Sequence, residues 1–252
     1  MSRAHPKQPV TGRNIPILAI TMPALKLLCL HGAGMNSEIM KSHLSSLAKT
    51  LEYRNIAQFA YAEGSVETEP GPGITPGLYE GPYYSFHIWP PKAGNLQDEE
   101  SIQNAYEELL EIIDDEGPFD GLLGFSHGGS FLAELLARYA RDNPATDVER
   151  LARCAVFINS FPPFRNDPDQ NPIIDYELLK HFPKIPTLHV VGTSDFVHEY
   201  STILYEKLHQ KAPTSTGLVT HSKGHEIPRD PKVLDKVVAG FEKLNFAVSF
   251  SH

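Results

Sequence analysis

The sequence predicts a single α/β domain: an open, mostly parallel, doubly wound sheet of about six strands with helices on both faces. Short apolar runs alternate with amphipathic stretches from one end of the chain to the other. Strands that are buried on both faces appear as continuous apolar runs, and strands separated by helices have to be parallel. The sequence contains no internal repeat and no domain linker, so we expect one sheet and one domain.

The elements follow in a regular order. The apolar runs expected to form strands are residues 25–30, 55–60, 119–124, 154–159, 186–191 and 216–221. The stretches expected to form helices are residues 37–51, 98–115, 128–142, 200–211 and 231–244. The third of these helices has the clearest helical period, with one apolar face made of Phe131, Leu132, Leu135, Leu136 and Tyr139.

Two segments depart from this alternation. Residues 61–96 are rich in glycine, proline and aromatic side chains, and residues 161–175 are rich in proline and aspartate. Long loops in a compact domain are usually lids or binding walls. We therefore expect both segments to contribute to the wall of a substrate site, although either can also be plain surface loop.

Charge and composition exclude several classes of partner. The chain has 252 residues, 41 % of them hydrophobic, and 31 acidic against 22 basic residues give a formal charge of −9. Binding to nucleic acid requires a surplus of lysine and arginine, and so does binding to an anionic membrane surface. We expect neither partner. No apolar stretch approaches the length of a transmembrane helix.

The amino terminus indicates where the domain begins, and the cysteines indicate the redox compartment of the protein. We interpret residues 1–24 as an N-terminal extension and residues 25–252 as the domain, because the first predicted strand starts at residue 25. Cys29 and Cys154 both lie in apolar runs, which favours buried thiols over a disulfide. These features predict a soluble protein of the cytoplasm.

A nucleophile motif follows the third predicted strand. Residues 124–128 read G-F-S-H-G and fit G-x-S-x-G, between an apolar run and the start of a helix. A nucleophile elbow requires this strand–turn–helix setting, because the sharp turn holds the serine out at the carboxyl end of the sheet. The helix dipole also favours negative charge at that point. We therefore expect an α/β-hydrolase fold with Ser126 as nucleophile, rather than a glycine-rich turn with a capping serine.

The serine requires a base, and in α/β-hydrolases the acid and then the histidine follow it in the chain. Asp195 lies on the loop after the fifth predicted strand, and His225 lies on the loop between the sixth strand and the last helix. We assign these two residues as the acid and the base. Among twelve histidines, the main rival base is His221, which closes the sixth strand itself. The rivals for the acid, which begin a helix or lie on an insertion, are Glu199 and Asp175.

An oxyanion hole requires two backbone N–H groups. The residue after the nucleophile, His127, supplies one. The loop H-G-A-G at residues 31–34 follows the first predicted strand directly, and its glycines allow the backbone to turn its N–H groups toward the substrate. We expect Ala33 to supply the second N–H, with Gly32 as the alternative.

No metal or cofactor is expected. His31, His127 and His225 lie on loops at one edge of the predicted sheet, but the sequence has no H-x-x-x-H, no cysteine cluster and no paired carboxylates at ligand spacing. It also lacks a P-loop and a G-x-G-x-x-G fingerprint.

An ordered set of motifs points to a family. LLCLHGAGM, EGPYYSF, DGLLGFSHGG, NSFPP, PTLHVVGTSDFV and HSKGHEIPR together resemble the FSH family of serine hydrolases, small eukaryotic α/β-hydrolases that are abundant in fungi. The resemblance covers residues 25–244 and implies the triad Ser126, Asp195 and His225. It implies a carboxylesterase or a thioesterase, and several fungal members are thioesterases encoded with polyketide synthases. The 24-residue extension departs from the usual start of the family.

The functional expectation is a serine hydrolase that cleaves an acyl thioester or ester through an acyl-enzyme on Ser126. The resemblance favours a thioesterase that releases a polyketide or other acyl chain from a carrier protein in fungal secondary metabolism. The alternatives are a carboxylesterase for free small esters, an acyltransferase or cyclase with the same triad, and a non-catalytic interaction protein. Because carrier domains are generally acidic, docking would require a local basic patch such as Lys223, Arg229 and Lys232.

Aromatic residues of the two loop segments are the candidates for the wall of a substrate pocket. The residues expected to bind substrate are Tyr83, Tyr84, Phe86, Trp89 and Phe161. The aromatic residues of the first segment can equally well fill the core, and the sequence does not separate these two interpretations.

Overall fold

The computed structural model describes residues 22–75, 77–89, 98–146 and 148–250. Six strands form the central sheet in the order β10-β9-β6-β5-β1-β2, and every pair of neighbours is parallel. The strands are β1 (Leu25–Leu30), β2 (Ala57–Ala62), β5 (Gly121–Phe125), β6 (Cys154–Ile158), β9 (Thr187–Gly192) and β10 (Thr216–His221). The predicted doubly wound α/β sheet is confirmed, with strand bounds that differ from the expected ones by two residues at most.

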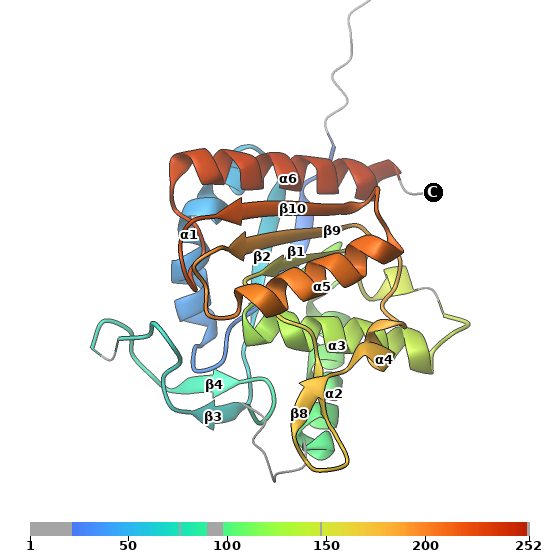
Figure 1. Ribbon diagram of the computed structural model, residues 1–252. Helices are drawn as coiled ribbons and strands as arrows, with labels where there is room; N and C mark the ends of the chain where they lie inside the picture. Colours follow the sequence, from blue (N-terminus) through green and yellow to red (C-terminus); the bar gives the residue numbers. More distant parts are fainter. Residues whose placement is uncertain (1–21, 76, 90–97, 147, 251–252) are drawn as a thin grey trace, which may run out of the picture.

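Helices cover both faces of this sheet (Figure 1). They are α1 (Ser37–Tyr53), α2 (Glu99–Glu116), α3 (His127–Asp142), α4 (Tyr176–Leu179), α5 (His198–Lys211) and α6 (Pro231–Phe250), with a short 3₁₀ turn at Val148–Arg150. One core cluster joins α1 and α6 to the sheet, and the other joins α2, α3, α4 and α5 to it. The sheet is therefore enclosed between two helical layers.

The central strands are apolar throughout because successive side chains enter different cores. In β1, Leu27 and Cys29 pack into the cluster with α1 and α6, whereas Leu28 and Leu30 pack into the cluster with α3. All four side chains are fully buried. This alternation explains why the strand appears in the sequence as a continuous apolar run.

Two small antiparallel hairpins lie outside the central sheet. The strands of the first are β3 (Val66–Thr68) and β4 (Tyr83–Ser85), and those of the second are β7 (Phe164–Asn166) and β8 (Pro172–Ile174). The hairpins lie within the two segments that depart from the sequence alternation. An isolated bridge between Met35 and Tyr84 ties the first hairpin to the loop that follows β1.

Because all six strands run in the same direction, the loops that follow them emerge at one edge of the sheet, where open α/β sheets bind their ligands. The predicted extension falls mainly on residues 1–21, which lie outside the described residues. Within the described ranges no helix is both long and apolar enough to cross a membrane. Cys29 and Cys154 are buried free thiols.

Candidate active site

Ser126 occupies a sharp turn between β5 and α3. Its backbone has φ of 55° and ψ of −123°, a conformation that side-chain-bearing residues rarely adopt. The Ser126 N–H donates to the carbonyl oxygen of Ile158 at the end of the neighbouring strand β6, at 2.9 Å. Strain of this kind persists only where the surroundings hold it, and it is common at functional sites. Here it turns the hydroxyl out of the sheet edge.

The glycines of the motif permit the tight turn because other backbone atoms lie where their side chains would be. A Cβ on Gly124 would lie 2.3 Å from the Cα of Gly129. A Cβ on Gly128 would lie 2.4 Å from the carbonyl oxygens of Leu30 and His31. Helix α3 can therefore pack closely against β5 and β1 only if these positions carry no side chain.

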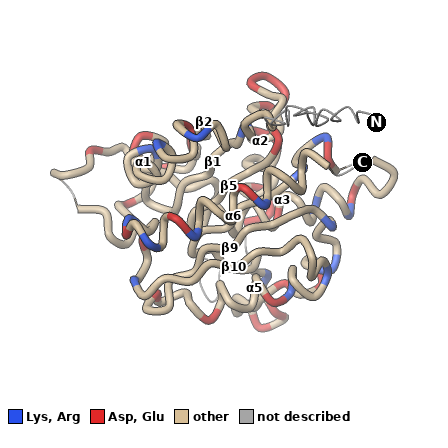
Figure 2. Tube along the Cα trace, turned by 90° about the horizontal axis from the view of Figure 1, so that it is seen from above, with Lys and Arg blue, Asp and Glu red and all other residues tan. Residues whose placement is uncertain are grey.

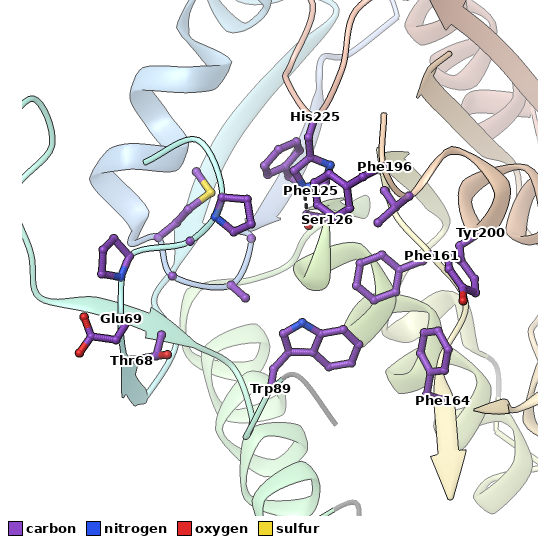
Figure 3. A pocket seen from close by; sticks show the side chains of 18 of the residues that line it. Thr68, Glu69, Trp89, Phe125, Ser126, Phe161, Phe164, Phe196, Tyr200 and His225 are labelled. Carbon is purple, nitrogen blue, oxygen red and sulfur yellow. Dashed lines mark hydrogen bonds between the residues drawn. The ribbon is translucent and has the colours of Figure 1, made fainter. Parts of the chain in front are cut away.

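Ser126, His225 and Asp195 form a continuous chain of hydrogen bonds. The Ser126 Oγ lies 2.8 Å from His225 Nε2 (Figure 3). On the other side of the ring, His225 Nδ1 lies 2.8 Å and 3.0 Å from the two carboxylate oxygens of Asp195. Because a carboxylate only accepts, His225 carries its proton on Nδ1 and leaves Nε2 free to accept from the serine. The Asp195 side chain is fully buried and also accepts the Val197 N–H at 3.0 Å.

The rivals from the sequence lie elsewhere. His221 is buried at the end of β10, its ring nitrogens have no partner among the described residues, and burial lowers its pKa. Asp175 caps α4 by accepting the Leu178 N–H, and Glu199 is exposed in the first turn of α5. None of the three has a hydrogen bond to Ser126.

Two aromatic rings flank the imidazole of His225. The Phe125 ring lies with its centroid 5.1 Å from that of His225, and the Phe196 ring lies 4.6 Å away. Sequence reasoning did not single out Phe196, although it directly follows the predicted acid and is 67 % exposed. An aromatic residue directly after the predicted acid is the signal in the sequence that could have identified it.

The loop after β1 presents a backbone amide to the serine. His31 is buried, donates from Nδ1 to the Gly32 carbonyl at 2.8 Å and accepts the Gly64 N–H on Nε2 at 3.0 Å. The Gly32 carbonyl and the Ala33 N–H belong to one planar peptide unit, so fixing the carbonyl also fixes the N–H. The described residues offer the Ala33 N–H no hydrogen-bond partner, and Ala33 lines the same cavity as Ser126. The Ala33 N–H is therefore free to donate a hydrogen bond to a negatively charged substrate oxygen.

The second expected donor is the His127 N–H, at the first residue of α3, where helix amides have no partner within the helix. The His127 side chain is buried against His87, with 3.1 Å between their Nε2 atoms. Burial lowers the pKa of His87 to about 4 and the pKa of His127 well below its ordinary value, so both rings are neutral. His87 Nδ1 lies 3.1 Å from the Ile88 carbonyl and must donate to it, so His127 donates the proton between the two rings.

A cavity of about 570 Å³ opens beside Ser126 (Figure 3). Met35 and the Pro70–Gly71–Pro72 turn line one side. The other side is aromatic, and the residues that line it are Trp89, Phe161, Phe164, Phe196 and Tyr200. Trp89 and Phe161 stack at 5.1 Å between ring centroids. The size is that of a small-molecule site, and the apolar lining suits an apolar acyl group.

Three residues expected in the pocket lie outside it. Tyr83 packs against the core and donates its hydroxyl to the Tyr79 carbonyl at 2.8 Å. Tyr84 supports the loop after β1 through its backbone, which donates to the Met35 carbonyl. Phe86 is 4 % exposed and stacks between a buried histidine and a core phenylalanine. The expectation that these three line the pocket is corrected: Tyr83 and Phe86 pack against the core instead, and Tyr84 contributes its backbone to the loop after β1.

No group of three or more histidine, cysteine, aspartate or glutamate side chains that could hold a metal ion occurs among the described residues. Ser126, His225 and Asp195 are joined by hydrogen bonds, and this arrangement can perform proton transfer and nucleophilic attack.

A strained serine at a strand–helix junction, bonded to a histidine and a carboxylate at the carboxyl edge of a parallel sheet, defines a serine hydrolase with the α/β-hydrolase fold. Residues 21–237 match a family model described as "Serine hydrolase (FSH1)". The chain belongs to this family, as the resemblance in the sequence predicts.

Individual relatives agree with this assignment. Hydrolase phiM of a fungal species (strain ATCC 74256) is 44 % identical over 228 residues, which cover 90 % of this chain and 99 % of that protein. Esterase FPY3 of Fusarium mangiferae is 31 % identical over 229 residues, covering 87 % and 96 %. Among solved structures, acyl-protein thioesterase 2 of Zea mays superposes with a TM-score of 0.57 at 15 % identity, covering 90 % and 96 %, and shows the same fold.

Proposed function

We propose that this serine hydrolase is a thioesterase that releases an apolar, conjugated or aromatic acyl chain, such as a polyketide, from a carrier-bound thioester. The observation that carries the proposal is the hydrogen-bonded chain of Ser126, His225 and Asp195 beside an apolar cavity of about 570 Å³. The membership of a serine hydrolase family supports the chemistry, and the aromatic lining supports the class of acyl group.

In the proposed mechanism, His225 Nε2 removes the proton of Ser126 as the serine attacks the acyl carbonyl. Asp195 holds the ring in the required tautomer and stabilises the imidazolium that forms. The N–H groups of His127 and Ala33 bind the oxyanion, and the loss of one such donor typically costs about 3 kcal/mol of transition-state stabilisation. His225 then protonates the leaving group. In the second half of the reaction, His225 takes a proton from the water that attacks the acyl-enzyme, and it returns this proton to Ser126 as the acid product leaves.

The aromatic side of the cavity supports the choice of acyl group. Trp89 and Phe161 stack with an interplanar angle of 24°, and Phe164 lies 6.0 Å from Phe161 between ring centroids. Flat conjugated groups gain about 0.5–1.5 kcal/mol from each such ring beyond the burial of area. A conjugated acyl chain therefore matches this wall better than a short polar acyl group.

A carrier domain is the proposed donor of the acyl group. Lys223, Arg229 and Lys232, the expected basic patch, are exposed on the segment that carries His225 and leads into α6. Glu226 and Asp230 are exposed on the same segment, and in Figure 2 basic and acidic residues are interspersed along the chain. Docking would therefore depend on these three cations locally rather than on the overall charge. The buried free thiols Cys29 and Cys154 support the proposed location in the reducing cytoplasm.

The test compares kcat/KM on an aromatic acyl thioester and on the oxygen ester with the same acyl group. A thioesterase hydrolyses the thioester more efficiently, and the carrier-bound form more efficiently than the same acyl group on a free thiol. Equal efficiency on carrier-bound and free thioesters would rule out the carrier part of the proposal. A clear preference for the oxygen ester would rule out the thioesterase.

The second candidate is a carboxylesterase that acts on free esters. Relatives that carry the name esterase favour it, among them Esterase FPY3, and the site has the same triad for either leaving group. Acyl transfer or cyclisation would also use this triad. Product analysis with and without a competing alcohol or amine distinguishes transfer from hydrolysis.

A further inference from the structure

One buried amide side chain at the edge of the sheet contacts two of the loops around the candidate active site. Asn159 directly follows β6 and is 0 % exposed. Its Nδ2 donates to the carbonyl oxygens of Glu226 at 2.9 Å and Gly224 at 3.4 Å. Its Oδ1 accepts the Gly192 N–H at 2.8 Å. The amide therefore uses both its donors and its acceptor.

These partners belong to the two loops that carry the acid and the base. Gly224 and Glu226 are the immediate neighbours of His225, and Gly192 ends β9 just before the turn that carries Asp195. The loops also bond to each other, because Ser194 N–H donates to the Lys223 carbonyl at 3.2 Å. That bond joins the loops without fixing them relative to the serine.

Strand β6 supplies the connection to the serine. The carbonyl of Ile158 accepts the N–H of Ser126, and the next residue is Asn159. Two consecutive residues therefore hold all three members of the triad: Ile158 through its backbone and Asn159 through its side chain. No residue of this pair lines the cavity beside Ser126.

Only asparagine combines the backbone and the hydrogen bonds required at this position. The φ of Asn159 is 47°, in the left-handed region, where asparagine is several-fold enriched among residues with a side chain. Aspartate has the same shape but only accepts, and glycine tolerates the backbone but has no side chain. These differences make two substitutions informative.

We infer that Asn159 is a positioning residue that sets the distance of His225 and Asp195 from Ser126, and so controls the rate of acyl transfer without contacting substrate. The inference rests on the proposed role of Ser126 as nucleophile. A misplacement of about 1 Å at a reacting group can lower the rate by about 10²-fold. Loss of the amide removes its hydrogen bonds to both loops at once, so we expect the effect to fall on the chemical step.

The test measures kcat, KM and thermal stability for Asn159→Gly and Asn159→Asp. Asn159→Gly keeps the backbone conformation and removes every side-chain bond, and it is expected to lower kcat by about 10²-fold with little change in KM. Asn159→Asp keeps the acceptor for the Gly192 N–H but places a carboxylate against the carbonyls of Gly224 and Glu226. Asn159→Asp is therefore expected to lower kcat by a similar factor. Because aspartate has the same volume as asparagine, this variant still tests the inference if Asn159→Gly does not fold.

Asn245→Ala is the matched control. Asn245 is also buried, at 3 % exposure, and donates to the carbonyls of Pro23 at 3.0 Å and Ile56 at 3.2 Å, on the helix α6. Its loss is expected to lower Tm without changing kcat. A fluorophosphonate probe gives a second readout, with slower labelling of Asn159→Gly than of wild type or the control.

The results distinguish failure of the positioning role of Asn159 from failure of the proposed function. If wild type is labelled but Asn159→Gly and Asn159→Asp keep the wild-type kcat, or raise KM instead, the positioning role is wrong while the proposed function stands. If the Asn245 variant loses kcat as strongly as the Asn159 variants, the effect is general destabilisation and the inference is also wrong. If wild type is neither labelled nor active, both the proposed function and this inference fail.

Discussion

The far end of the aromatic cavity leads to a prediction about acyl chain length. Phe164 on β7 and Tyr200 on α5 meet edge to face, with 5.6 Å between ring centroids. A second cavity of about 370 Å³ shares Phe164, Pro172 and Tyr200 with the first, so these residues stand between the two. The second cavity is lined further by Ile173 and Ile174. We therefore expect the Phe164 and Tyr200 rings to limit the length of the acyl chain that fits.

The perturbation is Phe164→Ala, which removes one ring of this pair. Each methylene group that gains a buried position contributes about 0.8 kcal/mol, or about fourfold in kcat/KM. An acyl chain that extends about four methylene groups into the second cavity gains about 3 kcal/mol, or about 200-fold, as an upper limit. The second cavity is lined partly by exposed residues, so the chain is buried there only in part. We therefore expect Phe164→Ala to raise kcat/KM for long chains relative to short ones by at least tenfold, or about 1.4 kcal/mol.

The assay measures kcat/KM for straight-chain acyl thioesters from butanoyl to palmitoyl, all on the same thiol. Wild type is expected to prefer shorter chains, and Phe164→Ala is expected to shift the optimum to longer ones. Tyr176→Ala is the control, because Tyr176 lines only the second cavity and is 44 % exposed. An unchanged chain-length profile in Phe164→Ala, or a wild type that already prefers palmitoyl, would show that these two rings do not limit the acyl chain.

Three further predictions concern the turn, the pocket wall and stability. Gly128→Ala places a Cβ 2.4 Å from the Leu30 carbonyl oxygen, so we expect kcat to fall by at least about 10²-fold in steady-state assays; a wild-type kcat would contradict the packing argument. Trp89→Ala is expected to lower kcat/KM for an aromatic acyl thioester by about threefold to tenfold but not for the acetyl thioester, and an equal loss on both would contradict a stacking role. Burial raises the pKa of Glu134 from 4.5 to about 7, so its folded form binds the proton more tightly and its contribution to stability is lost as pH rises through this range. Denaturation of wild type and Glu134→Gln should therefore show wild type losing stability relative to the variant from about pH 4.5 to about pH 7, and a constant difference would contradict the burial effect.

The sequence predicted the sheet, and the positions of Ser126, Asp195 and His225 at one edge of it, because both depend on local patterns. The side chains of a strand such as β6 pack alternately into the two core clusters, so every position of the strand has to be apolar. This pattern is visible in the sequence without knowledge of tertiary contacts. The order of serine, acid and histidine, each after its own strand, then places Ser126, Asp195 and His225 at one edge. In the structure their side chains are joined by hydrogen bonds of 2.8 Å.

The wall of the cavity could not be predicted in the same way, because it depends on how distant segments pair. The hairpin β3–β4 bridges to Met35 through Tyr84, and this pairing turns the expected pocket residues Tyr83 and Phe86 toward the core. Tyr200 reaches the cavity from a helix that begins at His198, where a sequence pattern does not specify the direction of the ring. Asn159 likewise gains its role only from two loops that lie more than 30 residues further along the chain.

An acyl-enzyme on Ser126 can be detected by mass spectrometry of the protein quenched during turnover of an aromatic acyl thioester. We expect a mass increase equal to the acyl group, located on the peptide that contains Ser126 and absent from Ser126→Ala, whose kcat falls by on the order of 10⁶-fold. An acyl group on another residue, or substantial turnover by Ser126→Ala, would contradict this expectation.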